Sequence, residues 1–423
     1  MKTKVQNSAS LLLVAALTLF SAGIAAAQTT ATMSTTESTS TTSTQTKTVA
    51  STDSTAVTSV GLNAGVTSLA GDSNGNVYAS LQYSNKVVKL NGGGTVIGTF
   101  AVGRNPTGMF VDNANGVLYV LNNADNTITK LRLDGTPVAT FKVAGDGPVH
   151  AALYGGVLYV ACERSNSLVR LSAADGTALG STDVGARPVW VVVGVTTTKY
   201  STSSGPVLTA DSAMASDSTM ASEPTISEEP TTDSTASSTD GESTTVDAST
   251  MDGSTTSSDG SMMVADSDAM SSDSMTTSSR TTTKTTVSVY VSCNKANQVW
   301  KLSSAGGVLG QFTTGRGPFG LALNSRGELL VACFWDSAVQ RLSSAGALLS
   351  RTAVGDGAAG MIPYGNVVAV ISNGANTITR LSLSDGTVIS KDLVDRSPLI
   401  GAATSSALWV ACTGNGTIAK RAL

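Results

Sequence analysis

A short hydrophobic motif recurs along this chain with a period close to 40 residues. A Lys or Arg stands twelve residues after the start of each copy. The seven copies begin at Val77, Leu118, Leu158, Val289, Leu329, Val368 and Leu408. Successive starts lie 41, 40, 131, 40, 39 and 40 residues apart. A fixed period of this length in a strand-rich chain is typical of a β-propeller with one blade per repeat, so the sequence predicts an all-β, seven-bladed propeller.

Each repeat divides into four predicted strands joined by turn-forming residues. In the second repeat we expect an inner strand at 107–112 and further strands at 117–122, 127–133 and 136–143. Asn, Asp and Gly fill the turns between them, since these residues tolerate positive φ. A Gly-x-x-Pro step, such as 145–148, then leads to the next blade.

The last repeat ends after its third strand, while residues 58–63 resemble the missing outer strand. We therefore expect the N-terminal strand to complete the C-terminal blade. Closing the ring in this way removes exposed sheet edges.

The composition divides the rest of the chain. Residues 1–27 have the basic start, apolar centre and small-residue end of a signal peptide, so we expect export. Residues 28–58 are dominated by Ser and Thr and are predicted to be a disordered leader. The propeller is expected over residues 59–423, interrupted in its fourth blade by a disordered insertion at 200–284.

The insertion is strongly acidic. Residues 201–280 contain fourteen Asp and Glu but one Arg, which gives a charge of −13. Because the whole chain carries −4, the signal peptide +2 and the leader −1, the remaining propeller body carries +8. A body with this charge attracts anionic polymers, and salt screens the attraction.

The repeat itself resembles a known family. The segment LYVLNNADNTITKLRLDGTPVATFKVAGDGP, at 118–148, and the next copy, at 158–188, resemble the YVTN repeats of propellers from bacterial envelopes and secretomes. The Asn-x-Ile-x-Lys portion is similar to NHL-type repeats. The resemblance covers 59–423 except the insertion. It implies the fold and an exported protein but no particular ligand, because such propellers serve many roles.

The blade-to-blade steps and the turns between second and third strands are expected to surround one mouth of the ring. His150 and Trp190 begin inner strands at positions where other blades have Gly108, Gly320 and Gly360. The predicted ligand-binding residues of this mouth are Arg104, His150, Arg164, Arg187, Trp190, Lys295, Arg316, Trp335 and Arg396. They would form a cationic, partly aromatic rim for an anionic or sugar-like group. The alternative is that they are solvated loop charges and side chains that fill the centre.

No catalytic residue, metal or cofactor is predicted. His150 is the only histidine, and Glu163 and Glu328 are the only glutamates of the propeller body, which disfavours a site that needs several such groups. A lyase or hydrolase that uses His150 remains an alternative. The insertion itself could be only a spacer, which could be glycosylated. A second alternative is Cu(I) binding through thioethers, because seven of the eleven methionines lie in the insertion. These are Met214, Met220, Met251, Met262, Met263, Met270 and Met275.

The four cysteines share one register, four residues after the start of their repeat motif. Equivalent positions in different blades lie too far apart for a disulfide, so we expect four reduced, mostly buried thiols at Cys162, Cys293, Cys333 and Cys412. The stem of the repeated third-strand cation is expected to lie along the neighbouring blade, with the charge outside.

The sequence thus predicts a secreted or periplasmic protein of the cell envelope that acts as a non-enzymatic binding or scaffold module. We expect a monomer without a membrane span. Its partner would be an unknown envelope component: an anionic polymer, a polysaccharide or a protein.

Overall fold

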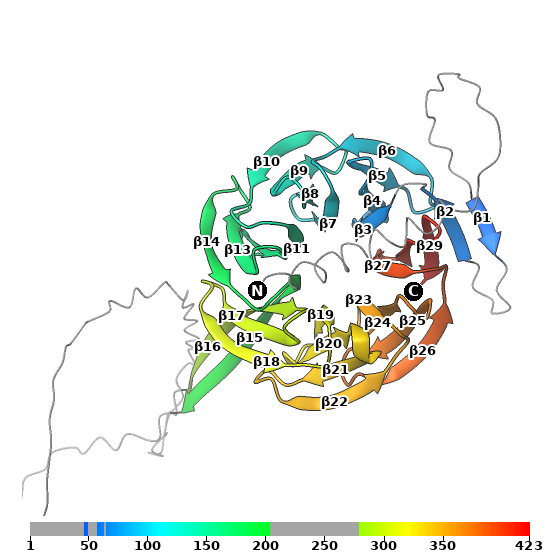
Figure 1. The fold of residues 1–423 in the computed structure, drawn as a ribbon. Coiled ribbons are helices and arrows are strands. Elements are labelled where there is room, and N and C mark those ends of the chain that lie inside the picture. Colours follow the sequence, from blue (N-terminus) through cyan, green and yellow to red (C-terminus); the bar gives the residue numbers. More distant parts are fainter. Residues whose placement is uncertain (1–45, 50–56, 63–64, 204–278) are drawn as a thin grey trace, which may run out of the picture. The chain divides into compact units, whose positions relative to one another are not determined.

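The computed structural model describes residues 46–49, 57–62, 65–203 and 279–423. The predicted signal peptide lies outside these residues. Within them the chain is all-β, apart from one 3-10 turn, η1 (Phe334–Asp336). Two compact units are present, one made of residues 1–196 with 286–423 and the other of residues 197–285. The first unit is a seven-bladed β-propeller, as the repeat predicts (Figure 1).

Six blades are antiparallel sheets whose strands follow chain order from the centre outward. Blade 1 contains β3 (Val66–Gly71), β4 (Val77–Leu81), β5 (Lys86–Leu90) and β6 (Val96–Ala101). Blade 2 contains β7 (Pro106–Asp112), β8 (Val117–Asn122), β9 (Thr127–Arg132) and β10 (Pro137–Lys142). Blade 3 contains β11 (Pro148–Tyr154), β12 (Val157–Cys162), β13 (Ser167–Ser172) and β14 (Ala178–Asp183).

Blade 4 contains β15 (Pro188–Ser203), β16 (Ser279–Cys293), β17 (Gln298–Ser303) and β18 (Val308–Thr313). Blade 5 contains β19 (Pro318–Leu323), β20 (Leu329–Cys333), β21 (Ala338–Leu342) and β22 (Leu348–Ala353). Blade 6 contains β23 (Ala358–Tyr364), β24 (Val367–Ser372), β25 (Thr377–Ser382) and β26 (Val388–Leu393).

The seventh blade combines both ends of the chain. It contains β27 (Pro398–Ala403), β28 (Ala407–Cys412) and β29 (Thr417–Ala422), and its fourth strand is β2 (Val57–Gly61). β2 pairs antiparallel with β29, with Thr58 opposite Lys420 and Gly61 opposite Thr417. The predicted closure of the ring by the N-terminal strand is therefore confirmed.

A fifth strand extends blade 7, which the sequence analysis did not predict. β1 (Thr46–Val49) pairs antiparallel with the outer edge of β2. It lies in the segment 28–58, for which a disordered leader was expected, and the rest of that segment before residue 57 is outside the described residues. β-branched residues favour extended backbone, and the edge of β2 offers unpaired backbone groups.

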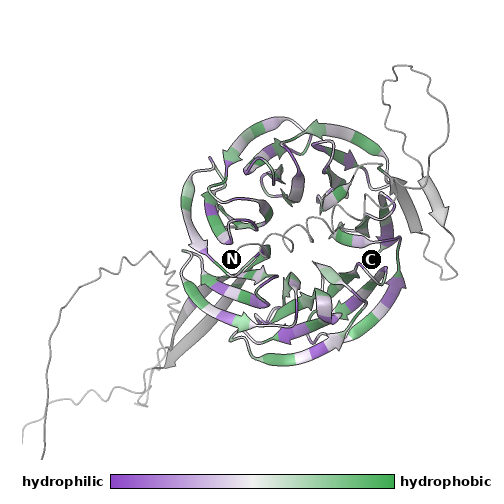
Figure 2. Ribbon diagram, viewed as in Figure 1, coloured by the Kyte–Doolittle hydropathy of each residue, from purple (hydrophilic) through white to green (hydrophobic). Residues whose placement is uncertain are grey.

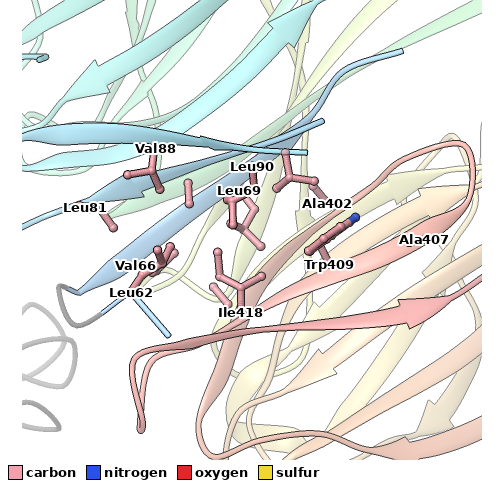
Figure 3. Packing of buried hydrophobic residues seen from close by; sticks show 13 residues of the cluster. Leu62, Val66, Leu69, Leu81, Val88, Leu90, Ala402, Ala407, Trp409 and Ile418 are labelled. Atoms are coloured by element: carbon pink, nitrogen blue, oxygen red, sulfur yellow. The ribbon is translucent and has the colours of Figure 1, made fainter. Parts of the chain in front are cut away.

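The junction between blades 7 and 1 has a continuous hydrophobic core (Figure 3). The indole of Trp409 is completely buried and shares this cluster with Leu69 of β3 and Ile418 of β29. Leu62, which follows the closing strand, is also buried there. The two ends of the chain are thus joined by backbone pairing and by side-chain packing.

The insertion leaves the propeller between the first two strands of blade 4. β15 and β16 continue past the blade, so residues 200–203 and 279–284, which were predicted to be disordered, lie in strands. These residues belong to runs rich in Thr and Val, which favour extended backbone. Residues 204–278 lie outside the described residues. At the point of exit, the hydroxyl of Thr196 donates to the carbonyl of Thr286 at 3.3 Å.

Neighbouring blades are connected by the repeated cation of the third strand through its charged group. Lys130 Nζ donates to the carbonyl of Ala173 in the next blade at 2.7 Å, and it lies 5.4 Å from the centre of the Tyr119 ring. The corresponding bonds are Lys89 to Leu133, Lys301 to Ser344, Arg341 to Ser384, Arg380 to Ala422 and Lys420 to Gly92. The seventh cation, Arg170, donates instead to Leu179 of its own blade.

Hydrophobic segments reach the outer strands in Figure 2. Exposed aliphatic side chains stand at the start of six outer strands, namely Ile97, Val138, Leu179, Val308, Leu309, Leu348, Leu349, Val388 and Ile389. Among the described residues no helix is long and apolar enough to cross a membrane.

The four cysteines are completely buried and form no disulfide, as predicted. Burial raises the pKa of each thiol to about 12.

Candidate functional site

One face of the propeller is built from the blade-to-blade steps and the turns between second and third strands, and we call it the loop face. Each turn bonds to the step that enters its own blade, as where Asn123 N–H donates to the carbonyl of Asn105 at 2.9 Å. The turn then holds the step into the next blade through an asparagine with positive φ. Asn126 has φ 54°, and its side-chain oxygen accepts the N–H of Gly147 at 2.9 Å.

The same bond recurs around the ring. Asparagine fits because it tolerates the left-handed conformation and carries a short acceptor. The other pairs are Asn85 with Asn105, Asn166 with Arg187, Asn297 with Gly317 and Asn376 with Ser397. This network fixes the backbone of five of the seven blade-to-blade steps.

The predicted rim residues lie where the sequence analysis placed them along the fold. Steps carry Arg104, Arg187, Arg316 and Arg396; turns carry Arg164, Lys295 and Trp335; inner strands carry His150 and Trp190. The structure brings His150 to Trp190, and Arg316 to Trp335.

Most of the rim arginines are paired with carboxylates, so the rim is less cationic than a count of its arginines suggests. In blades 2 and 5 the arginine of the step donates to the aspartate of the turn from both its backbone N–H and its Nε. These bonds hold the pKa values of Asp125 and Asp336 below their usual range. The pairs are Arg104 with Asp125 (2.5 Å), Arg164 with Asp146 (2.8 Å), Arg187 with Glu163 (3.3 Å) and Arg316 with Asp336 (2.7 Å).

The pair of Arg187 and Glu163 is the least accessible of these. Their side chains are 12% and 11% exposed. Arg187 has φ 60°, a left-handed conformation that is unfavourable for a bulky residue. Glu163 also accepts a bond from Asn123 Nδ2 at 3.4 Å, and burial lowers the pKa of Arg187. We interpret this pair as a structural connection between blades 3 and 4.

Three aromatic rings from successive blades lie together at the starts of the inner strands. The ring of His150 stacks on Trp190, with centroids 4.2 Å apart, and Trp190 contacts Phe319 at 6.2 Å. Trp190 is 8% exposed and belongs to a hydrophobic cluster, so its side chain packs into the interior of the ring.

His150 is held as a neutral acceptor. Its Nδ1 accepts the backbone N–H of Val191 at 3.3 Å, and burial lowers the pKa of His150 to about 4. This environment matches the alternative in which these side chains fill the centre.

The second residue of a turn rests on a glycine of the step when its side chain is large. An added Cβ at Gly317 would lie 2.5 Å from Trp335, and one at Gly65 would lie 2.6 Å from Tyr83. Trp335 is 57% exposed and Tyr83 is 53% exposed, and they are the two large exposed hydrophobic residues among the described turns of this face. Tyr83 was missed by the sequence analysis, although it shares its turn position with Trp335.

Groups of three or more His, Cys, Asp or Glu that could hold a metal ion are absent from the part of the chain that the structure describes. The methionines proposed for Cu(I) lie at 214–275 and are outside that part.

No family model matches the chain, and no curated protein matches it in sequence. Solved structures match it in fold. A streptogramin B lyase has a TM-score of 0.57 at 13% identity and covers 86% of this chain and 96% of its own. Virginiamycin B lyase from Staphylococcus aureus has a TM-score of 0.57 at 12% identity, with 87% and 99% covered. Hydrazine synthase from Kuenenia stuttgartiensis has a TM-score of 0.56 at 11% identity, with 85% and 96% covered.

At such low identity these matches show the shared fold alone. They include two lyases and a synthase, so this fold does not specify one chemistry. The chain is a seven-bladed β-propeller whose hydrogen-bonded loop face carries exposed side chains.

Proposed function

We propose that this chain is an exported, non-enzymatic binding propeller of the bacterial cell envelope, of YVTN/NHL type, which holds its ligand or partner on the loop face. The observation that carries the proposal is the construction of that face. Its backbone is fixed by repeated asparagine bonds, while Trp335 and Arg316 remain exposed upon it. Rigid elements that present exposed polar and aromatic groups suit recognition, because little order is lost on binding.

Binding is preferred over chemistry at His150. Catalysis by acid or base needs a pKa near the working pH, whereas the pKa of His150 is lowered to about 4. Its ring is occupied by the stack with Trp190 and by the bond from Val191. The fold that this chain shares with lyases is therefore no argument for a lyase reaction at His150.

The insertion is proposed to be a spacer or an intramolecular competitor for the basic body. It is joined to blade 4 at Thr196 and Thr286, in the connection between first and second strands. Within the propeller, such connections bond to the turns between third and fourth strands, as Leu133 N–H does to Gly116, and so lie at the other end of the blade from the loop face.

A deletion of residues 201–280 tests the proposal. Binding of the mature protein and of the deletion variant would be measured against envelope polysaccharides, anionic polymers and envelope proteins at low and high salt. Binding that depends on the propeller, and that strengthens on deletion of the acidic segment, is the expected result. Loss of all binding on deletion would instead assign the function to the insertion, and fractionation of the native host would test export.

A further inference from the structure

Trp335 has a setting that the other blades reproduce only in part. Its turn is the 3-10 turn η1, and Phe334 packs against the indole edge-on, with centroids 4.7 Å apart. The indole lies against Gly317, which has φ 66° and no side chain to displace it. The result is an exposed aromatic surface whose position is determined by the backbone beneath it.

The guanidinium of Arg316 is bonded to the turn that carries this surface. Its Nε donates to Asp336 Oδ1 at 2.7 Å, and its Nη2 donates to the carbonyl of Trp335 at 3.2 Å. These bonds use two of the five N–H donors of a guanidinium, so three have no partner among the described residues. The Arg316 side chain is 72% exposed. Arg351 lies 3.8 Å from Asp336, so two cations accompany one carboxylate.

The surroundings of Trp335 favour a sugar over a protein surface. Protein hot spots sit in well-packed apolar centres from which water is excluded. The charged residues Arg316 and Asp336 lie next to Trp335, and most of the exposed aliphatic residues lie on the outer strands. A pyranose ring has one face of C–H groups and a rim of hydroxyls, which matches an isolated indole surrounded by fixed polar groups.

We propose that Trp335 and Arg316 form a binding site for an acidic polysaccharide, in which the ring of a uronic acid stacks on the indole and its carboxylate binds the guanidinium. Arginine suits this role because its planar fork matches a carboxylate in two-point geometry. The proposal rests on the proposed function, since it names the ligand class of the same loop face.

The repeat supplies matched controls, because each half of the site occurs alone in another blade. Arg104 and Asp125 in blade 2 reproduce the pair of Arg316 and Asp336, but Ala124 stands where blade 5 has the tryptophan. Tyr83 in blade 1 reproduces the ring on a glycine, but in the sequence an alanine precedes that glycine, where Arg316 precedes Gly317.

The test uses the full mature chain with oligogalacturonate as the probe and maltohexaose as a neutral oligosaccharide. We expect Trp335→Ala and Arg316→Gln each to raise the Kd for oligogalacturonate roughly tenfold or more. Tyr83→Ala and Arg104→Gln should raise it far less, because each of these residues lacks the other half of the site beside it. Bound oligogalacturonate should also protect wild-type tryptophan fluorescence from acrylamide, and Trp335→Ala should abolish that protection. Circular dichroism confirms that each variant folds.

Three results would overturn the proposal: no binding of oligogalacturonate, equal binding of maltohexaose, or losses that are the same in the variants and in their controls. None of them would by itself remove the proposed function. The proposed function fails separately, if the propeller binds no envelope polysaccharide, anionic polymer or envelope protein in the deletion experiment.

Discussion

The backbone N–H of Gly317 donates to the side-chain oxygen of Asn297 at 2.8 Å, and this bond joins the turn of blade 4 to the step of blade 5. Asn297 has φ 55°, and Gly317 is the residue on which Trp335 rests. One asparagine therefore ends a turn, holds the neighbouring blade and positions the candidate site.

This bond makes a prediction about stability. Asn297→Gly keeps the left-handed backbone but loses the hydrogen bond, which should cost about 1 kcal/mol. Asn297→Ala loses the bond and also places a Cβ in the left-handed conformation, which should cost roughly 1–2 kcal/mol more. Urea denaturation of both variants measures the difference. An alanine variant as stable as the glycine variant would show that the conformation of residue 297 is not a constraint.

The connection by Lys130 makes a second prediction. Lys130→Met keeps the length of the stem but removes the donor to Ala173 and the cation above Tyr119. We expect a loss of about 1–2 kcal/mol in the free energy of unfolding, because removal of the charged donor leaves a carbonyl of the next blade without its hydrogen-bond partner. Lys142→Met, on an exposed position of an outer strand, is the control and should change stability little. Equal effects in the two variants would contradict the role of Lys130.

Features that repeat could be predicted from the sequence. The blade count, the closure of blade 7 and the role of the third-strand cations follow from positions that return every 40 residues. The pairs of step arginine and turn aspartate were also visible, since Arg104 and Asp125 have nearly the same spacing as Arg316 and Asp336. The prediction of a cationic rim left out these aspartate partners.

Features that depend on contacts between different blades could not be predicted in the same way. Trp190 is buried because His150 and Phe319 come from the blades on either side, and a single repeat contains one of the three rings. The exposure of Trp335 depends on a glycine in its step, a signal that would also have identified Tyr83. The continuation of β15 and β16 past the blade depends on pairing between segments separated by the insertion.

The pair of Arg187 and Glu163 makes a third prediction. Removal of either partner should destabilise the protein by about 3 kcal/mol, since the other charge is left in a largely buried place. The double variant Arg187→Gly/Glu163→Gln should be more stable than the sum of the two single effects, because it removes both charges and the positive φ of a bulky residue. Urea denaturation of the four proteins completes the cycle. Additive effects would mean that the two side chains act independently.

The buried thiols make a fourth prediction. Burial raises the pKa of Cys162, Cys293, Cys333 and Cys412 to about 12, so little thiolate is present near neutral pH. The folded protein should therefore react with iodoacetamide far more slowly than the protein unfolded in urea. Mass spectrometry after timed quenching counts the modified cysteines. Rapid modification of the folded protein would show that the blades open readily at these positions.

The stack of His150 and Trp190 makes a final prediction, about pH. The ordinary pKa of histidine is 6.5, whereas burial lowers the pKa of His150 in the folded protein to about 4. Between these values the unfolded chain binds a proton that the folded chain does not bind. Stability should therefore fall as pH falls through this window, by up to ~3 kcal/mol.

His150→Phe keeps an aromatic ring next to Trp190 and removes the titrating group. Its free energy of unfolding should change less than that of the wild type between pH values of about 6.5 and 4.5, because the chain has no other histidine. Carboxylates such as Asp336, whose pKa is lowered from 3.8, lose most of their contribution below that value, so they change little between pH values of about 6.5 and 4.5. Urea denaturation at several pH values measures both proteins. Parallel curves would mean that His150 takes up its proton in the folded protein as easily as in the unfolded chain.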